Sequence, residues 1–441
     1  MKQCKQKRRQ LATPRASLCV LGQVVQEVGV FRDLAQVKIP QKMLRYTPQQ
    51  KLTALLAGML AGASTVKETD TTVGTDLAVQ LAFGLPACPD QSTLQDTLDA
   101  ATWENVAQLR QLTEELFRRY SPAVRRVAAG ALVWVDIDLT PLPVSGRSEG
   151  SERGYFGRER SKTGRKLLRV RTAPEQEVVY QRVVSGKAAS GLALLQEAML
   201  ELERVLGLDT PEHRALIAVR LDAGFGSEES HRWLLERGYH LLGKMKSGQR
   251  ARKLAGPVAE WWPTSSPGRE VGVVQGPVDL GRPTQQYGVR TPSKDKPGST
   301  YYAVLVSTLG LTPQEAVAAY DGRAGMENDF KGDKQGLGLR SRRKRKLAAQ
   351  EMVVLLAGLA RNLLLWCRRW LAQGDLRLGK LGIVRLVREV WTVPGCVTFR
   401  QGQLTRVKLV RTHPLGRQVR QGLRVLLQAI GHPNITLGYS G

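Results

Sequence analysis

The chain has 441 residues, enough for two or three domains and a sizeable core. With 66 Lys and Arg against 39 Asp and Glu, its net charge is +27, which favours a polyanionic partner: nucleic acid first, an anionic membrane second. A protein that is merely basic is the alternative. The five cysteines are scattered without a CxxC pair, which argues against a disulfide framework or a zinc finger and fits a reducing cytoplasm.

Residues 1–125 predict a helical N-terminal domain that binds DNA ends. Residues 47–50 form a capping box ahead of an apolar run, a second helix is expected to start at Ser92, and a third near Thr102. Such a bundle can hold a helix-turn-helix that reads DNA, or serve as a dimerisation or scaffold unit, and both interpretations stay open.

The pattern changes to an α/β order over residues 126–249. The sequence predicts three strands (residues 131–140, 167–172 and 177–184), a helix (191–206), a strand (215–221), a helix (228–237) and a strand (239–245), in that order. This is the element order of the ribonuclease H-like fold, so the sequence predicts a core of that type.

Residues 250–310 interrupt the core with a stretch rich in Gly, Pro and short β-prone pieces, which predicts a β-rich insertion. The core resumes over residues 311–372. Its apolar helix, residues 347–371, is broken by polar residues too often for a membrane span and is expected to be a core helix. Residues 373–441 predict a hairpin around residues 401–403 and a helix over residues 417–430, with dimerisation as an open role.

A cluster of four residues in the second part of the core carries chemistry: Tyr320, Arg323, Glu327 and Lys334. On one ideal helix they would fall within an arc of about 60° and project from one face. A carboxylate there can bind a divalent cation, and Arg and Lys can hold phosphates beside it.

The start of that predicted helix is a capping box over residues 312–315, with Pro at the first helical position. Three glycines inside the helix each cost about 1 kcal/mol relative to alanine. Tertiary packing is therefore expected to hold together the segment that contains Gly322, Gly325 and Gly332.

Two aspartates complete a set of three carboxylates. Asp138 is predicted at the end of the first strand of the core and Asp222 at the end of the fourth, and these strands are central neighbours in a ribonuclease H-like sheet. With Glu327 they would supply oxygen ligands for a pair of divalent ions in a phosphoryl-transfer site. Mg²⁺ suits such a site because it prefers hard oxygen ligands, and Mn²⁺ is expected to substitute.

Other acidic residues compete for these roles. Asp136 lies two residues before Asp138 and points to the same face, but Asp138 is preferred because it is nearer the predicted strand end. Asp329 and Asp333 compete with Glu327. For Asp222 itself, the alternative is a residue that forms the turn after its strand.

The densest charge run of the chain is residues 340–346, in which every residue but Ser341 is basic. Arg342, Arg343 and Lys344 are predicted to contact the DNA backbone next to a phosphate-cutting site. A solvated loop is the alternative interpretation.

The cluster has a defined spacing: two residues separate Tyr320 from Arg323, three separate Arg323 from Glu327, and six separate Glu327 from Lys334. This spacing resembles the signature of bacterial insertion-sequence transposases of the DDE class, in the insertion-sequence-four superfamily. The segments at Asp138 and Asp222 are similar to the first two catalytic segments of that family, and its β-rich insertion matches residues 250–310. The resemblance covers about residues 130–370.

The resemblance implies an enzyme that binds transposon ends, cleaves double-stranded DNA through a hairpin intermediate and joins the 3′ ends to target DNA as a homodimer. It implies DNA contacts by Tyr320, Arg323 and Lys334, and a flipped base stabilised by Trp261 or Trp262. A cytoplasmic, nucleoid-associated location away from membranes is expected. The alternatives are a catalytically silent DNA-binding protein derived from such a transposase, and a nuclease of the same fold without strand transfer.

Overall fold

The structure is a computed structural model that describes residues 8–41, 45–154, 156, 162–293 and 298–440. The chain divides into two compact units. The sheet unit comprises Ser121–Pro143 and Glu152–Asn328. The helical unit comprises Met1–Tyr120, Val144–Ser151 and Asp329–Gly441. The five-segment division predicted from the sequence stays a prediction.

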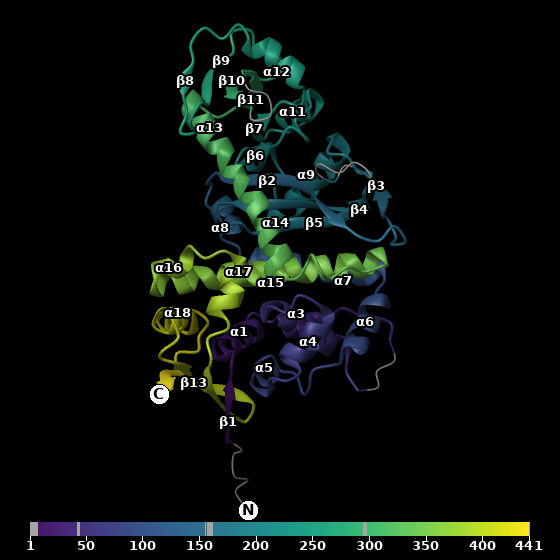
Figure 1. The fold of residues 1–441 in the computed structure, drawn as a ribbon, viewed down its shortest axis with the longest axis vertical. Helices are drawn as coiled ribbons and strands as arrows, with labels where there is room; N and C mark the ends of the chain where they lie inside the picture. The colour runs from purple at the N-terminus through teal and green to yellow at the C-terminus, as the bar shows by residue number, and fades with distance from the viewer. Residues whose placement is uncertain (1–7, 42–44, 155, 157–161, 294–297, 441) are drawn as a thin grey trace, which may run out of the picture. The chain divides into compact units, whose positions relative to one another are not determined.

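The sheet unit is built on a mixed sheet whose central strands follow the order β5-β4-β2-β6-β7 (Figure 1). β2 pairs antiparallel with β4 and parallel with β6, which pairs parallel with β7. The strands are β2 (Val133–Pro143), β4 (Thr163–Ala173), β5 (Val178–Ser185), β6 (Ile217–Leu221) and β7 (His240–Lys244), with β3 (Glu152–Arg153) at the edge. The helices between and beside them are α8 (Pro122–Ala128), α9 (Leu192–Leu206), α10 (Pro211–Arg214) and α11 (Glu228–Glu236). This mixed α/β order is consistent with the ribonuclease H-like core expected from the sequence.

The insertion extends the same sheet. After α12 (Gly248–Ala255), the chain adds β8 (Trp262–Pro263), β9 (Glu270–Val273), β10 (Gln285–Pro292) and β11 (Thr300–Ser307). β11 pairs antiparallel with β7, and the order continues β10-β9-β8. The predicted β-rich stretch is therefore present, and it covers the edge of β7 that would otherwise be unpaired.

Helices cover both faces of this sheet. Leu242 of β7 and Leu305 of β11 pack in one cluster with Ala316 and Val317 of α13 (Pro313–Asp321). The neighbouring Gly243 faces the other way, against His231 of α11. Because side chains alternate along a strand, α13 and α11 lie on opposite faces. We call the first the α13 face.

The helical unit is organised around α15 (Leu347–Gly374), which contacts α3, α6, α7, α16 and α18. By length and composition alone α15 could span a membrane, but it is almost wholly buried. The other helices are α1 (Ala16–Glu27), α2 (Val30–Leu34), α3 (Pro48–Leu60), α4 (Val66–Val73), α5 (Leu77–Ala82), α6 (Gln91–Asp99), α7 (Trp103–Tyr120), α16 (Leu376–Gly379), α17 (Ile383–Arg385) with the π-helical turn η2 (Leu386–Val390), and α18 (Gly416–Ala429). A second sheet has the order β1 (Arg8–Thr13), β12 (Gly395–Arg400), β13 (Gln403–Val410), β14 (Thr436–Ser440).

Local signals explain several of these elements. The capping box at Thr47 is confirmed, since its side chain accepts from the Gln50 backbone N–H and the Gln50 side chain accepts from Thr47. α6 begins one residue before the predicted Ser92, because Asp90 caps it by accepting from the Thr93 N–H at 2.8 Å. The hairpin of β12 and β13 turns through Gln401 and Gly402, both with positive φ, as a tight two-residue hairpin requires.

Candidate functional site

Strand alternation places both upstream aspartates on the α13 face. Asp136 of β2 pairs with Arg220 of β6, and Arg220 pairs with Leu242 of β7, so all three residues are on the α13 face. Asp138 and Asp222 lie two residues beyond Asp136 and Arg220, so they are on the same face. Asp222 directly follows β6, as predicted. Asp138 is not at a strand end, because β2 continues to Pro143 in pairing with β4. The pairing of β2 with β6 does end at Asp136, so Asp138 lies where those strands part.

The segment that carries the late cluster is not one helix, so the prediction of a single helical face was wrong. α13 ends at Asp321, a 3₁₀ turn, η1, spans Gly322–Ala324, and α14 spans Gly325–Gly336. A 3₁₀ turn has about three residues per turn, so the one-face argument does not carry across it. The predicted capping box is confirmed, since Thr312 accepts from the Glu315 N–H and the Glu315 carboxylate accepts from the Thr312 N–H at 2.8 Å.

Arg323, in the 3₁₀ turn, reaches both aspartates. Its Nη2 lies 3.2 Å from Asp138 Oδ1 and 3.7 Å from Asp222 Oδ2. The Arg323 side chain is 11% exposed. Burial acts to lower the pKa of Arg323, but the carboxylates of Asp138 and Asp222 outweigh it and the pKa is raised. Arg323 therefore holds a permanent positive charge against both carboxylates.

The charges of two proposed ligands, Asp222 and Glu327, act on the third, Asp138. The pKa of Asp138 is raised, first by burial and then by the charges of Asp222 and Glu327, while Arg323 opposes the rise. Glu327 itself is exposed in the first turn of α14. Among the described residues, no group of three or more His, Cys, Asp or Glu is close enough to hold a metal ion as placed. The candidate donors are nevertheless all carboxylate oxygens, which fit a hard divalent cation.

The other two members of the cluster are placed differently. Tyr320 packs against the apolar cluster under α13. Burial raises the pKa of its phenol to about 12, and the charge of Arg323 opposes the rise. Lys334 lies further along α14, past the unit boundary at Asp329, with its ammonium 5.9 Å from the centre of the Phe330 ring. The structure thus brings Tyr320, Arg323 and Glu327 to the aspartates, and assigns Lys334 to the helical unit.

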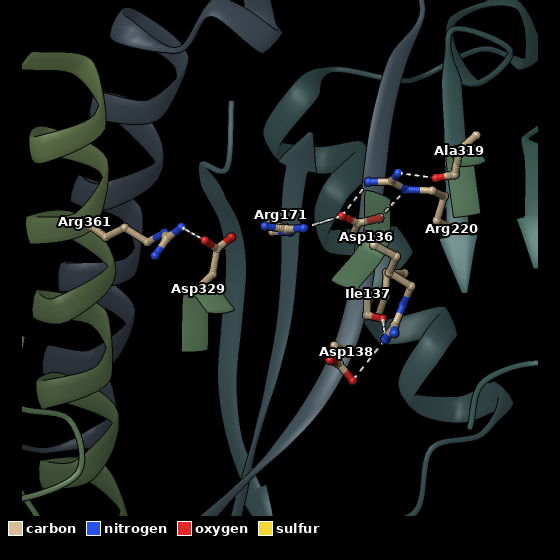
Figure 2. A network of polar contacts seen from close by, with 9 residues as sticks. Asp136, Ile137, Asp138, Arg171, Arg220, Ala319, Asp329 and Arg361 are labelled. Atoms are coloured by element: carbon tan, nitrogen blue, oxygen red, sulfur yellow. Dashed lines mark hydrogen bonds and ion pairs between the residues drawn. The ribbon is translucent and has the colours of Figure 1, made fainter. Parts of the chain in front are cut away.

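The competing acidic residues are bonded to buried arginines. Asp136 is 0% exposed and accepts from Arg171 at 2.9 and 3.1 Å and from Arg220 at 2.7 and 2.9 Å (Figure 2). In the helical unit, Asp329 and Asp333 each lie 2.8 Å from the guanidinium of Arg361. These three carboxylates already have charged partners inside the fold.

The basic run after α14 has two buried members. Arg342 donates to Ala63 O at 2.8 Å, and burial lowers its pKa to about 10. Lys344 donates to Gln95, and burial lowers its pKa to about 8. A DNA contact by either residue would need this segment to open. Arg343 is exposed, with its Nε donating to Arg340 O at 3.0 Å.

Sequence reasoning missed Arg171 and Arg220, which bind Asp136. A signal existed for Arg220, because it is a basic residue inside the otherwise apolar strand β6. Lys and Arg are rarely buried without a charged partner, so Arg220 predicted a buried acid on a neighbouring strand. Arg171 gave no such signal, because β4 carries four basic residues.

One protein family matches this chain. Residues 132–363 match the family described as transposase DDE domain. Among solved structures, the chain is similar to the piggyBac transposase in a synaptic complex with hairpin DNA, with 14% identity, a TM-score of 0.45, and coverage of 87% of this chain and 83% of that one. A search of curated proteins gives no match.

Proposed function

The chain belongs to the transposase DDE domain family, and from that premise we propose that it is a cut-and-paste transposase of the insertion-sequence-four type, which binds transposon ends, cleaves the DNA and joins the 3′ ends to target DNA. The observation that carries the proposal is the position of Arg323 against both Asp138 and Asp222 on the α13 face, with the charge of Glu327 also acting on Asp138. A buried acid whose pKa is raised and that has specific charged neighbours is typical of a functional site.

The roles follow from the chemistry of each group. Asp138, Asp222 and Glu327 would hold Mg²⁺, with Mn²⁺ as a substitute, and the bound ions would supply activation of the attacking oxygen and stabilisation of the leaving oxygen. Arg323 is a charged donor next to those carboxylates and is suited to a phosphate beside the scissile bond. Tyr320, in the last turn of α13, would support Arg323 by packing against the apolar cluster between this helix and the sheet. Lys334 and the exposed Arg343 are assigned to more distant phosphates of the same DNA.

The insertion supplies aromatic groups for a displaced base. Trp261 is stacked by Arg290, whose guanidinium lies 4.4 Å from the ring centre, and meets Tyr302 edge-on at 6.4 Å. Both Trp261 and Trp262 are only partly buried. Aromatic faces of this kind can stack on an unpaired base. We assign the flipped base of the transposition pathway to Trp261 or Trp262, and the protein to a homodimer on DNA in the bacterial nucleoid.

The test uses purified full-length protein, a labelled duplex that carries the DNA flanking its coding region, a target plasmid, and Mg²⁺. A transposase gives cleaved ends and end-to-plasmid joined products. A nuclease of the same fold gives cleavage without joining, and a silent DNA-binding derivative gives a gel shift without cleavage. Protein that neither shifts nor cuts a duplex with inverted repeats would contradict the proposal.

A further inference from the structure

We propose that Asp136, Arg171 and Arg220 form a positioning network that seats residues 319–325 on the sheet and so aligns Arg323 and Glu327 with Asp138 and Asp222. This inference rests on the proposed function of that site. The three network residues do not touch the substrate in the proposal; they act through the segment that they hold.

The sheet itself builds the network. Asp136 of β2 is paired in register with Arg171 of β4 on one side and with Arg220 of β6 on the other, so the three side chains form one row across three strands. The carboxylate of Asp136 accepts from both guanidinium groups at 2.7 to 3.1 Å and is completely buried. Arg220 binds both carboxylate oxygens in a bidentate pair, whereas the Nε and Nη2 of Arg171 both donate to Oδ2. Two bonds from one guanidinium fix its plane, so both arginines have defined positions.

Arg220 then reaches from the row to the end of α13. Its Nη1 donates to Ala319 O at 2.7 Å. Ala319 is in the last turn of α13, where carbonyl groups lack partners within the helix and where a positive charge is favourable. Arg220 thus binds the last turn of α13 at Ala319, one residue before Tyr320 and three residues before the 3₁₀ turn begins at Gly322.

Two glycines let the segment approach the arginines. A Cβ on Gly322 would lie 2.8 Å from Arg220 Nη1, and a Cβ on Gly325 would lie 3.2 Å from Arg171 Nη2. Both residues have right-handed helical backbone angles, with φ of −54° and −55°, so glycine is not needed for its conformational freedom. The close approach to the network explains why these two positions, on either side of Arg323, lack a side chain.

The row of Asp136, Arg171 and Arg220 lies next to the carboxylates of the proposed site. Asp138 and Asp222 lie two residues beyond Asp136 and Arg220 on the same face, so the row is one side-chain step from the carboxylates. A segment that is held at Ala319, Gly322 and Gly325 leaves Arg323 little freedom to move from its place against them. Misplacing a catalytic group by about 1 Å can cost about 100-fold in rate.

The experiment is a double-mutant cycle of Gly322→Ala and Arg220→Lys, read by cleavage and binding of the labelled duplex described above. Gly322→Ala removes no buried charge, and the gain of about 1 kcal/mol from replacing a helical glycine offsets the cost of the close contact, so we expect the protein to stay folded with a melting temperature near that of wild type. Arg220→Lys keeps a cation for Asp136 but removes the group that a new Cβ would meet. Gly332→Ala on α14 is the matched control, because its Cβ would meet Ile383 at an ordinary 3.7 Å.

We expect Gly322→Ala to slow cleavage about 10-fold or more with DNA affinity within about twofold of wild type, and Gly332→Ala to cleave normally. In the Arg220→Lys background, Gly322→Ala should slow cleavage by less than about a further twofold, because the two changes act on one contact. If Arg220→Lys does not fold, Gly325→Ala with Arg171→Lys repeats the cycle, with a smaller expected effect at Gly325 because its contact is longer.

Cleavage by Gly322→Ala at the wild-type rate would overturn the inference, and so would equal losses in both backgrounds, which would mean that the network only stabilises the fold. A wild-type protein that binds the duplex but does not cut it would overturn the proposed function and, with it, the premise of this inference. Cleavage by the wild-type protein in the same assay distinguishes the two failures.

Discussion

Replacement of Glu327 by Gln separates chemistry from folding, because of where this residue lies. Glu327 is exposed in the first turn of α14. An acidic group at a helix N-terminus contributes about 0.3–1 kcal/mol, and other exposed substitutions stay within about 0.5 kcal/mol. Gln keeps the size of the side chain, so we expect the free energy of unfolding to fall by less than about 1 kcal/mol.

The expected loss in catalysis is far larger. Gln replaces one of three carboxylates with a neutral amide and removes one of the charges that raises the pKa of Asp138. Both changes weaken the attraction for a divalent cation at that site. We expect cleavage of the labelled duplex to slow about 1,000-fold or more, equivalent to about 4 kcal/mol in the activation barrier. DNA binding should stay within about twofold, because a negative charge near DNA is removed and no cation is lost.

The assay is a single-turnover cleavage time course in Mg²⁺, with gel-shift affinity and urea denaturation on the same preparations. Glu236→Gln is the control, since it makes the same change at an exposed helical position of the same unit. Cleavage by Glu327→Gln at more than about a tenth of the wild-type rate would refute the assignment of Glu327 as a ligand. Equal loss in Glu236→Gln would point to a general effect of charge.

Three further outcomes are expected. Asp136→Asn leaves two buried guanidinium groups without a counter-charge and should lower the free energy of unfolding by about 3–5 kcal/mol in urea; a loss below 1 kcal/mol would contradict this. Burial lowers the pKa of His231 from 6.5 to about 4. The unfolded chain therefore binds more protons in this window, so stability should fall by up to about 3 kcal/mol from pH 6.5 to 4, and His231→Leu should remove that loss. Arg343→Ala should weaken DNA binding and reduce the salt slope by about one without loss of stability, whereas Arg342→Ala should destabilise; the reverse pattern would refute their placement.

Elements with strong local signals could be predicted from the sequence. The capping boxes at Thr47 and Thr312 and the turn at Gln401 and Gly402 depend on residues within four positions of each other. The order of strands and helices along the core could be predicted from the succession of apolar runs, because parallel neighbours need crossover helices between them. The pairing of the insertion with β7 had no such local signal.

The site depends on partners that are distant in the sequence. The break in the helix after α13 lies beside Arg220, which belongs to β6 and contributes no local signal near Gly322. The preference for Asp138 over Asp136 was argued from the strand end, which the structure places further on, whereas the engagement of Asp136 by Arg171 and Arg220 arises from strand register. The burial of Arg342 against Ala63 was equally invisible in a run of charges.

Charge on the α13 face changes sign from one row of side chains to the next. In the row of Asp136, two arginines face one carboxylate, and burial closes this row off from solvent. One step further, Asp138 and Asp222 both contact Arg323, Arg169 of β4 pairs with Asp138 across the strands, and Glu327 adds a third carboxylate, so that three acids face two arginines. That second row is more open, with the Asp222 side chain 35% exposed. A chain with a net charge of +27 thus keeps a local negative excess at this one edge. DNA phosphates attracted by the basic surface would be repelled here unless a cation intervened, so cleavage should require divalent ions even under conditions in which binding does not.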